Sequence, residues 1–188
     1  MLPPCAQPGA QPMRDTPLMA RTLSFDPIAE AQRQWDVHWG PDATAPMGAV
    51  TSIMRAQQVL LARLNALLEP WELTFPRYEA LMLLFYSRRG ALPLGKMGDR
   101  LQVHRASVTN VVDRLVEQEL VARVPQQHDR RSVLAQITPR GRSVARAATK
   151  RLNEERFAMA PLADGPCDEL FRLLRPLRAQ AGDFDPAE

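Results

Sequence analysis

Residues 92–140 constrain the fold of this chain more than any other stretch, because two kinds of hydrophobic spacing follow one another there. Within residues 105–119 the apolar side chains recur in steps of three, one, three and one, and they are Val108, Val111, Val112, Leu115 and Val116. This spacing predicts a helix with one buried face. Residues 120–124 and 132–138 are rich in β-branched side chains and predict strands. The stretch therefore predicts helix, turn, helix, strand, turn, strand.

The opposite face of the second predicted helix is polar. It carries Ser107, Asn110 and Arg114, with Thr109 beside them, which are short hydrogen-bonding groups and one cation; Arg105, where the helix begins, is a further candidate. Groups of this kind can approach base edges and phosphates closely, so this face is a candidate for contact with DNA. The alternative is an ordinary solvated helix face.

The turn between the two predicted strands, PQQHDRR, places Asp129, Arg130 and Arg131 near its tip. An arginine on such a tip suits the narrow, strongly negative minor groove of DNA. Asp129, two residues before Arg131, can hold the guanidinium through a charge-assisted hydrogen bond. The alternative is a solvent-exposed hairpin that binds nothing.

The segments LQVHRASVTNVVDRL and HDRRSVLAQITPRG, together with the upstream LTFPRYEALMLL, resemble the MarR family of bacterial transcription regulators. The likeness spans about residues 46–180. It implies that the helix at residues 105–119 enters the major groove, and that Asp129 and Arg131 match the family's D-x-R wing motif, whose arginine enters the minor groove. One departure is His104, because serine is common there in the family. Histidine is not a preferred N-cap, so we expect the first helical turn to be held in another way.

This resemblance implies a mainly α fold with a small β-wing, in a chain long enough for one domain with a core. We expect a disordered proline-rich tail at residues 1–24 and one MarR-type domain at residues 25–188. Within that domain, the winged helix-turn-helix covers about residues 75–140. The dimerisation helices cover about residues 26–69 and 141–180.

Local signals place the remaining helices. Asp26-Pro27 opens a helix that carries Trp35 and Trp39 and ends at Gly40-Pro41. A long helix is expected at residues 46–69, a third at residues 74–86 with Thr74 as its cap, and a turn at residues 87–91. After the wing, Thr138-Pro139 opens a helix that runs to about Met159. Residues 161–166 form a break, and the last helix, at residues 167–180, is kinked or shortened by Pro176.

Two features raise the question of a ligand. Arg142, Arg146 and Lys150 recur every four residues and form either a solvated face or an anion-binding or DNA-flanking stripe. The resemblance also implies a small effector, often anionic and aromatic or lipophilic, between the dimerisation helices and the DNA-binding lobe. Candidate pocket residues are Trp35, His38, Arg63 and Tyr78, with packing and surface roles as the alternative.

Other classes of function lack support in the sequence. No apolar run is long enough for a membrane span and the N-terminus does not resemble a secretory signal, so we expect a cytoplasmic protein. The three histidines fall in different predicted elements, and no common nucleophile or phosphate-loop motif occurs. We therefore expect no metal, no cofactor and no enzymatic activity. Cys5 and Cys167 cannot form a disulfide framework.

The favoured hypothesis is a homodimeric repressor that binds double-stranded DNA at a pseudo-palindromic site and is released by a small effector. Two alternatives remain open. One is a redox-sensing regulator that uses Cys5 or Cys167, as some relatives use a cysteine placed elsewhere. The other is a protein-interaction module that no longer binds DNA, against which Asp129 and Arg131 argue.

Overall fold

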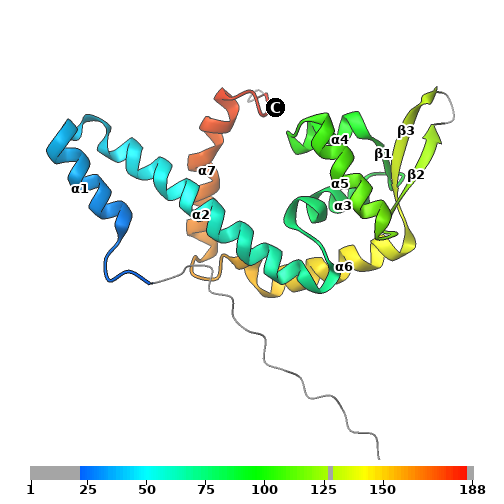
Figure 1. The fold of residues 1–188 in the computed structure, drawn as a ribbon, viewed down its shortest axis with the longest axis horizontal. Coiled ribbons are helices and arrows are strands. Elements are labelled where there is room, and N and C mark those ends of the chain that lie inside the picture. Colours follow the sequence, from blue (N-terminus) through cyan, green and yellow to red (C-terminus); the bar gives the residue numbers. More distant parts are fainter. Residues whose placement is uncertain (1–21, 127–128, 186–188) are drawn as a thin grey trace, which may run out of the picture. The chain divides into compact units, whose positions relative to one another are not determined.

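The computed structural model describes residues 22–126 and 129–185. The contacts within the chain divide it into two compact units, and the boundary in the sequence falls between Val59 and Leu60. Cys5 and most of the predicted tail lie outside the described residues. Helices and strands carry the labels of Figure 1.

The first unit is a pair of helices. Helix α1 spans Pro27–Trp39, and the Asp26 carboxylate accepts a hydrogen bond of 2.8 Å from the backbone N–H of Ile28, which confirms the predicted cap. The short 3-10 helix η1 (Pro41–Ala43) leads into α2 (Thr44–Leu68), whose last nine residues belong to the second unit. Gly48 of α2 lies directly against the side chain of Gln32, so the start of α2 packs against α1.

The second unit contains the other elements of the described chain. In order, they are η2 (Glu69–Trp71), α3 (Phe75–Tyr86), β1 (Ala91–Pro93), α4 (Leu94–Leu101), α5 (Arg105–Glu117), β2 (Val121–Gln126), β3 (Asp129–Ile137), α6 (Pro139–Glu154), η3 (Arg156–Ala158) and α7 (Asp164–Gln180). The mainly helical fold with a small sheet confirms the predicted fold class.

The sheet has three antiparallel strands in the order β1-β3-β2. Strands β2 and β3 form the predicted hairpin, in which Val121 pairs with Ile137 and Val124 with Leu134. Strand β1 was not predicted, because residues 87–91 were assigned to a turn and the strand has only three residues. Pro93 pairs with Leu134 at the edge of the sheet, where a proline is tolerated because one side of the strand needs no partner.

The core of the second unit lies where α3, α4, α5 and α6 meet. Leu84 of α3, Met97 of α4, Leu115 of α5 and Leu152 of α6 are all completely buried. The predicted apolar stripe of α5 is confirmed: Val108, Val112 and Leu115 are buried, and Val111 and Val116 pack against the core from its margin. Burial of this stripe orients the polar face of α5 toward solvent.

Several predicted helix ends differ from those observed. Thr74 makes no side-chain cap for α3; instead the Asn65 side-chain oxygen accepts from the N–H of Phe75 at 2.8 Å. Helix α5 ends at Glu117, before the left-handed Glu119. Helix α6 ends at Glu154, because Arg156, Phe157 and Ala158 all adopt positive φ.

Helix α7 also differs from its prediction. It begins at Asp164, within the predicted break, and continues through Pro176 to Gln180, so the predicted shortening is wrong. The residues after α7 fold back on it: Asp183 forms an ion pair of 2.6 Å with Arg178, and Arg175 lies 4.6 Å from the centre of the Phe184 ring. These contacts hold the last turn beyond the proline.

Candidate nucleic-acid interface

The solvent-facing side of α5 carries the side chains expected to contact DNA. Ser107, Asn110 and Arg114 are exposed, whereas Thr109 is partly buried. Arg114 forms an ion pair of 2.8 Å with Glu117 one turn further on, and both side chains are more than half exposed. Such an exposed pair contributes little stability, so Arg114 can exchange this partner for a phosphate. Arg105 is the first residue of α5, and its side chain is outside the described part.

The first turn of α5 is held by His104, contrary to the expectation that another group would do so. The Nδ1 atom of His104 accepts a hydrogen bond of 3.3 Å from the backbone N–H of Ala106. The imidazole thus takes the place of the hydroxyl or carboxylate that usually satisfies a free N–H group at a helix start.

Helix α5 is also fixed against its neighbours. A Cβ atom on Gly98 of α4 would lie 3.2 Å from the carbonyl oxygen of Val103 and 3.4 Å from Val108, so α4 and α5 approach closely at this glycine. On the other side, Asp113 of α5 forms an ion pair of 2.6 Å with Arg123 of β2. The ion pair joins α5 directly to the wing.

The wing places the predicted tip residues together. Asp129, Arg130 and Arg131 are the first three residues of β3, and Asp129 pairs with Gln126 across the hairpin after a register shift. They therefore lie at the end of the hairpin farthest from α6. Their side chains are outside the described part of the chain, so their contact with DNA stays a prediction.

The wing joins α5 and α6 at one junction. The Thr138 hydroxyl accepts from the N–H of Gly141 at 2.9 Å, which confirms the predicted cap of α6, and donates to the carbonyl oxygen of Glu119 at 2.8 Å. A Cβ atom on Gly141 would lie only 2.1 Å from the carbonyl oxygen of Leu120. The backbone just after α5 therefore touches the first turn of α6.

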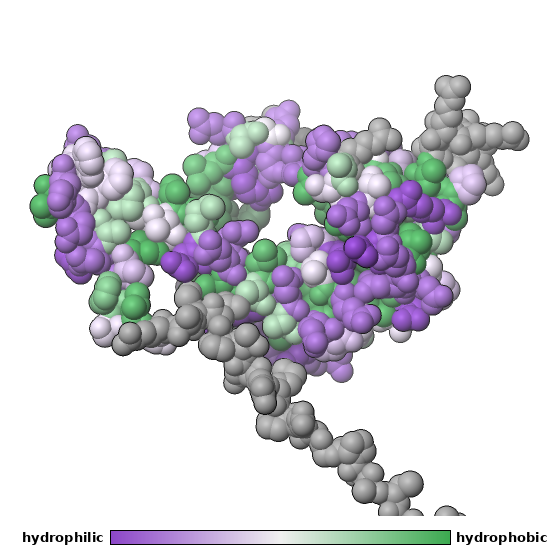
Figure 2. All heavy atoms as spheres, viewed as in Figure 1, coloured by the Kyte–Doolittle hydropathy of each residue, from purple (hydrophilic) through white to green (hydrophobic). Residues whose placement is uncertain are grey.

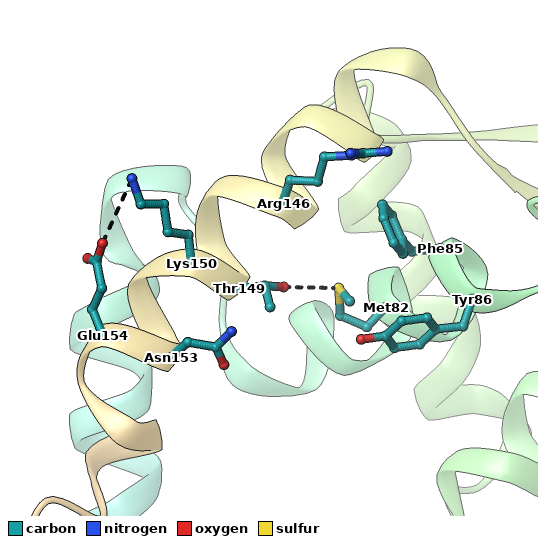
Figure 3. A pocket seen from close by; sticks show the side chains of 8 residues that line it. All are labelled: Met82, Phe85, Tyr86, Arg146, Thr149, Lys150, Asn153 and Glu154. Carbon is teal, nitrogen blue, oxygen red and sulfur yellow. Dashed lines mark hydrogen bonds and ion pairs between the residues drawn. The ribbon is translucent and has the colours of Figure 1, made fainter.

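A cavity of about 470 Å³ lies between α3 and α6 (Figure 3). It is lined by Met82, Phe85, Tyr86, Arg146, Thr149, Lys150, Asn153 and Glu154. Apolar and aromatic side chains come from α3, while polar and charged ones come from α6. Arg146 extends toward Phe85, and its guanidinium carbon lies 5.5 Å from the ring centre (Figure 3).

The four residues predicted for an effector pocket are not among those that line this cavity in the structure. Tyr78 is buried in the core, with only 5% of its surface exposed, and its hydroxyl lies 3.0 Å from the Thr149 hydroxyl. Burial raises the pKa of Tyr78. Tyr78 therefore supports the cavity through Thr149 without lining it. Arg63 is exposed on α2, and Trp35 and His38 belong to the first unit, so a role for the four stays a prediction.

Sequence reasoning missed Phe85 and Tyr86 as lining residues. The sequence signal for this cavity was the spacing of Arg142, Arg146 and Lys150 at every fourth residue. That spacing fits either a solvated face or an anion-binding or DNA-flanking stripe. The cations and the aromatic rings are about sixty residues apart in sequence, and they meet only because α6 packs on α3. Among the described residues, no group of three or more His, Cys, Asp or Glu side chains could hold a metal ion. In the same part of the chain, no helix is both long and apolar enough to span a membrane.

Comparison with known proteins decides the family. The model of the MarR family matches residues 73–133, which cover α3, α4, α5 and most of the wing. The crystal structure of Sco5413, a MarR family transcriptional regulator from Streptomyces coelicolor, is 51% identical in sequence, with a TM-score of 0.70; the match covers 75% of this chain and 98% of that one. The chain belongs to the MarR family.

Two further relatives of this MarR-family chain bear on its function. The HTH-type transcriptional regulator MhqR of Bacillus subtilis is 33% identical over 89 residues, which are 47% of this chain and 60% of that protein. The chain spans about half the length of the curated relatives it matches. The PcaV regulator of Streptomyces coelicolor, solved in complex with its natural ligand, is 26% identical with a TM-score of 0.59; the match covers 78% of this chain and 96% of PcaV. Sco5413, MhqR and PcaV are all transcriptional regulators.

Proposed function

We propose that this MarR-family protein is a repressor that binds a pseudo-palindromic site in double-stranded DNA as a homodimer. The observation that supports this most is the exposed polar face of α5 beside an antiparallel hairpin whose second strand begins with Asp129, Arg130 and Arg131. A helix of this kind fits the major groove, and an arginine on a wing fits the adjacent minor groove.

Each side chain has a physical role in this proposal. Ser107 and Asn110 are short and exposed, so they can form hydrogen bonds with base edges without holding the helix away from the groove. Arg105 and Arg114 neutralise phosphates at the two ends of the helix, which supplies affinity but not sequence specificity. Arg131 enters the minor groove, with Asp129 orienting its guanidinium.

The proposed dimer is supported by the apolar surface of α7. Phe171, Leu173 and Leu177 are about 60% exposed or more, and hydrophobic residues reach the surface along this helix in Figure 2. A second copy would cover them, which is how exposed apolar patches of this kind are usually used. A two-fold dimer would then present two α5 helices to half-sites about one helical turn apart.

The test is a titration of operator DNA at several salt concentrations with the Arg131→Ala variant. The operator fragment would first be selected from random DNA by the wild-type protein. We expect weaker binding and a salt dependence reduced by about one ion, because one phosphate-region contact is lost. Arg77→Ala is the matched control, since Arg77 lies at the start of α3 and contacts the Glu72 carbonyl. Unchanged affinity and slope in Arg131→Ala would show that the wing does not contact DNA.

The proposed function includes release from DNA by a small effector. The cavity between α3 and α6 supports this part, because α6 follows directly from the wing strand β3 and shares the Thr138 junction with it. A ligand that binds one position of α6 better than another would shift the position of the wing. The solved complex of PcaV shows that a transcriptional regulator of the same fold binds a natural ligand, which supports a ligand for this chain as well.

A further inference from the structure

The cavity between α3 and α6 continues into a row of cations on the surface. This row carries more positive charge than a single carboxylate could neutralise. We call Arg88, Arg89, Arg142, Arg146 and Lys150 the cationic row. Arg146 and Lys150 line the cavity, and Arg142 is one helical turn before Arg146 on α6. From Arg142 to Lys150 the helix rises about 12 Å.

Arg142 connects the cavity to the turn after α3. Its guanidinium carbon lies 5.8 Å from the centre of the Phe85 ring, on which Arg146 also lies. A Cβ atom on Gly90 would be 2.3 Å from an Nη atom of Arg142, so this guanidinium touches the turn that carries the exposed Arg88 and Arg89. The row therefore runs without a break from the cavity to the turn at residues 87–90.

Little negative charge faces this row. Residues 139–151 include no acid, and the first one after them, Glu154, lies 3.9 Å from Lys150 at the far end of the cavity (Figure 3). Within the described residues, Arg88, Arg89, Arg142 and Arg146 have no ion-pair partner. Two guanidiniums on one ring repel each other, and an anion between or beside them would relieve this repulsion.

We propose that this site binds an aromatic or flat apolar molecule that carries at least two negative charges, as a phosphate ester does. The apolar part would lie on Phe85, Tyr86 and Met82, and the phosphate would bind Arg142 and Arg146 through charge-assisted hydrogen bonds. Arg88, on the turn that the Arg142 guanidinium touches, adds positive charge around the phosphate, and Arg89 extends the site to ligands with further phosphates. This inference rests on the proposed effector control and names the chemical class of the effector.

The experiment is a calorimetric titration of the full-length protein with three probes, at constant ionic strength. The probes are 2-naphthyl phosphate, 2-naphthoate and inorganic phosphate. Together they separate the contribution of the aromatic ring to binding from the contribution of the number of negative charges. We expect naphthyl phosphate to bind about tenfold more tightly than naphthoate, because it gains one charge-assisted contact. Inorganic phosphate should bind more weakly than either ring compound.

The variants identify the residues responsible. In the double variant Arg88→Gln and Arg142→Gln the advantage of naphthyl phosphate over naphthoate should disappear, whereas naphthoate should still bind. Arg77→Gln, at the opposite end of α3, is the control and should keep the advantage. Arg142 and Arg88 are both accessible from solvent, so we expect the double variant to keep the wild-type melting temperature. Equal affinity for the two ring compounds in the wild type, or an advantage that survives in the double variant, would overturn the proposal.

Release of DNA is measured separately, by fluorescence anisotropy of a labelled operator. If naphthyl phosphate binds as expected but leaves the complex with DNA intact, the site stands and the proposed effector control is wrong. If the protein binds DNA but shows no preference for naphthyl phosphate, the site is wrong and the DNA-binding function stands. Loss of DNA binding on addition of naphthyl phosphate, but not of naphthoate at the same concentration, would support both.

Discussion

Gly141 allows α6 to begin directly against the backbone that follows α5. A Cβ atom at this position would lie 2.1 Å from the Leu120 carbonyl oxygen and 2.9 Å from Ile137. A backbone oxygen cannot move aside as the end of a long side chain can, so only glycine fits without a shift of the helix.

We predict that Gly141→Ala lowers the free energy of unfolding by about 1–3 kcal/mol, the usual cost of overpacking. Urea unfolding followed by circular dichroism measures it. Gly165→Ala is the control: it is also in a helix, nothing lies within 4 Å of its Cβ position, and alanine favours helix more than glycine does. If both variants are as stable as the wild type, the close contact at Gly141 does not exist in solution.

Burial of Tyr78 should make the stability of the fold depend on pH in the alkaline range. Its folded-state pKa is raised above the ordinary value of 10.0, mainly by burial, so the neutral hydroxyl is favoured by folding. This contribution to stability is complete below pH 10 and is lost as the pH rises through the raised pKa. Unfolding of the wild type should therefore become easier above about pH 10, and Tyr78→Phe should reduce that dependence.

At neutral pH Tyr78→Phe should lower stability by about 1 kcal/mol, because the hydrogen bond to Thr149 is lost. Tyr86→Phe is the control, since that side chain is 75% exposed. Urea titrations at neutral and alkaline pH measure both effects. The same pH dependence in Tyr78→Phe and the wild type would mean that ionisation of Tyr78 does not limit alkaline stability.

Helix α5 begins with an unusual cap. A histidine nitrogen accepts from the Ala106 N–H at 3.3 Å, which is longer than the cap distances of 2.8 Å and 2.9 Å at α1 and α6. The longer distance indicates a weaker hydrogen bond at the start of α5.

We predict that His104→Ser raises the melting temperature and His104→Ala lowers it, each by an amount equivalent to about 0.5–1 kcal/mol. The two variants differ only in the hydroxyl, so the difference between them measures the cap. Differential scanning calorimetry gives both values. If serine and alanine are equivalent at this position, the first turn of α5 is held by tertiary packing alone.

The helices of this chain were largely predictable because their signals are local. The Asp26 and Thr138 caps and the apolar stripe of α5 act within one or two turns, and all three were confirmed. Strand β1 was missed because three residues carry no periodicity, and its pairing with β3 links positions over forty residues apart. The cap of α3 was missed for the same reason, since Asn65 belongs to the preceding long helix.

The candidate sites also divide into features with a local signal in the sequence and features that form only when distant segments meet. The polar residues of α5 could be selected from spacing alone, because burial of one face exposes the other. The cavity could not, because Phe85 of α3 and Arg146 of α6 become neighbours only in the folded chain. Trp35, His38, Arg63 and Tyr78 were selected from family resemblance and chemical type, and spacing alone could not test them.

The protein leaves large apolar side chains of α7 exposed to water. None of the residues of α7 is buried, although Leu173 and Leu177 lie one turn apart on the same side of it and Phe171 is a further large apolar side chain. Association with a second copy would remove this surface from water and would also bring together two copies of the proposed DNA-binding helix α5.

We predict that Leu173→Asp, combined with Leu177→Asp, converts the protein to a monomer in light scattering after gel filtration. Two buried charges at an interface cost several kcal/mol unless they are paired. Affinity for a two-half-site duplex should fall strongly, while affinity for a single half-site should not change. Arg172→Asp, an equally charged change elsewhere on α7, is the control. A dimer that persists in the double variant would place the interface elsewhere.

The direct passage from β3 into α6 at Thr138 has a mechanical consequence. Strand β3 has nine residues, so it reaches about 30 Å from that junction. If α6 and β3 rotate together as one rigid body, a rotation of about 5° displaces the tip of the wing by about 2–3 Å. This displacement is comparable to the length of a hydrogen bond. A small rotation at this junction would therefore be enough to break the contact that we propose between the wing and the minor groove.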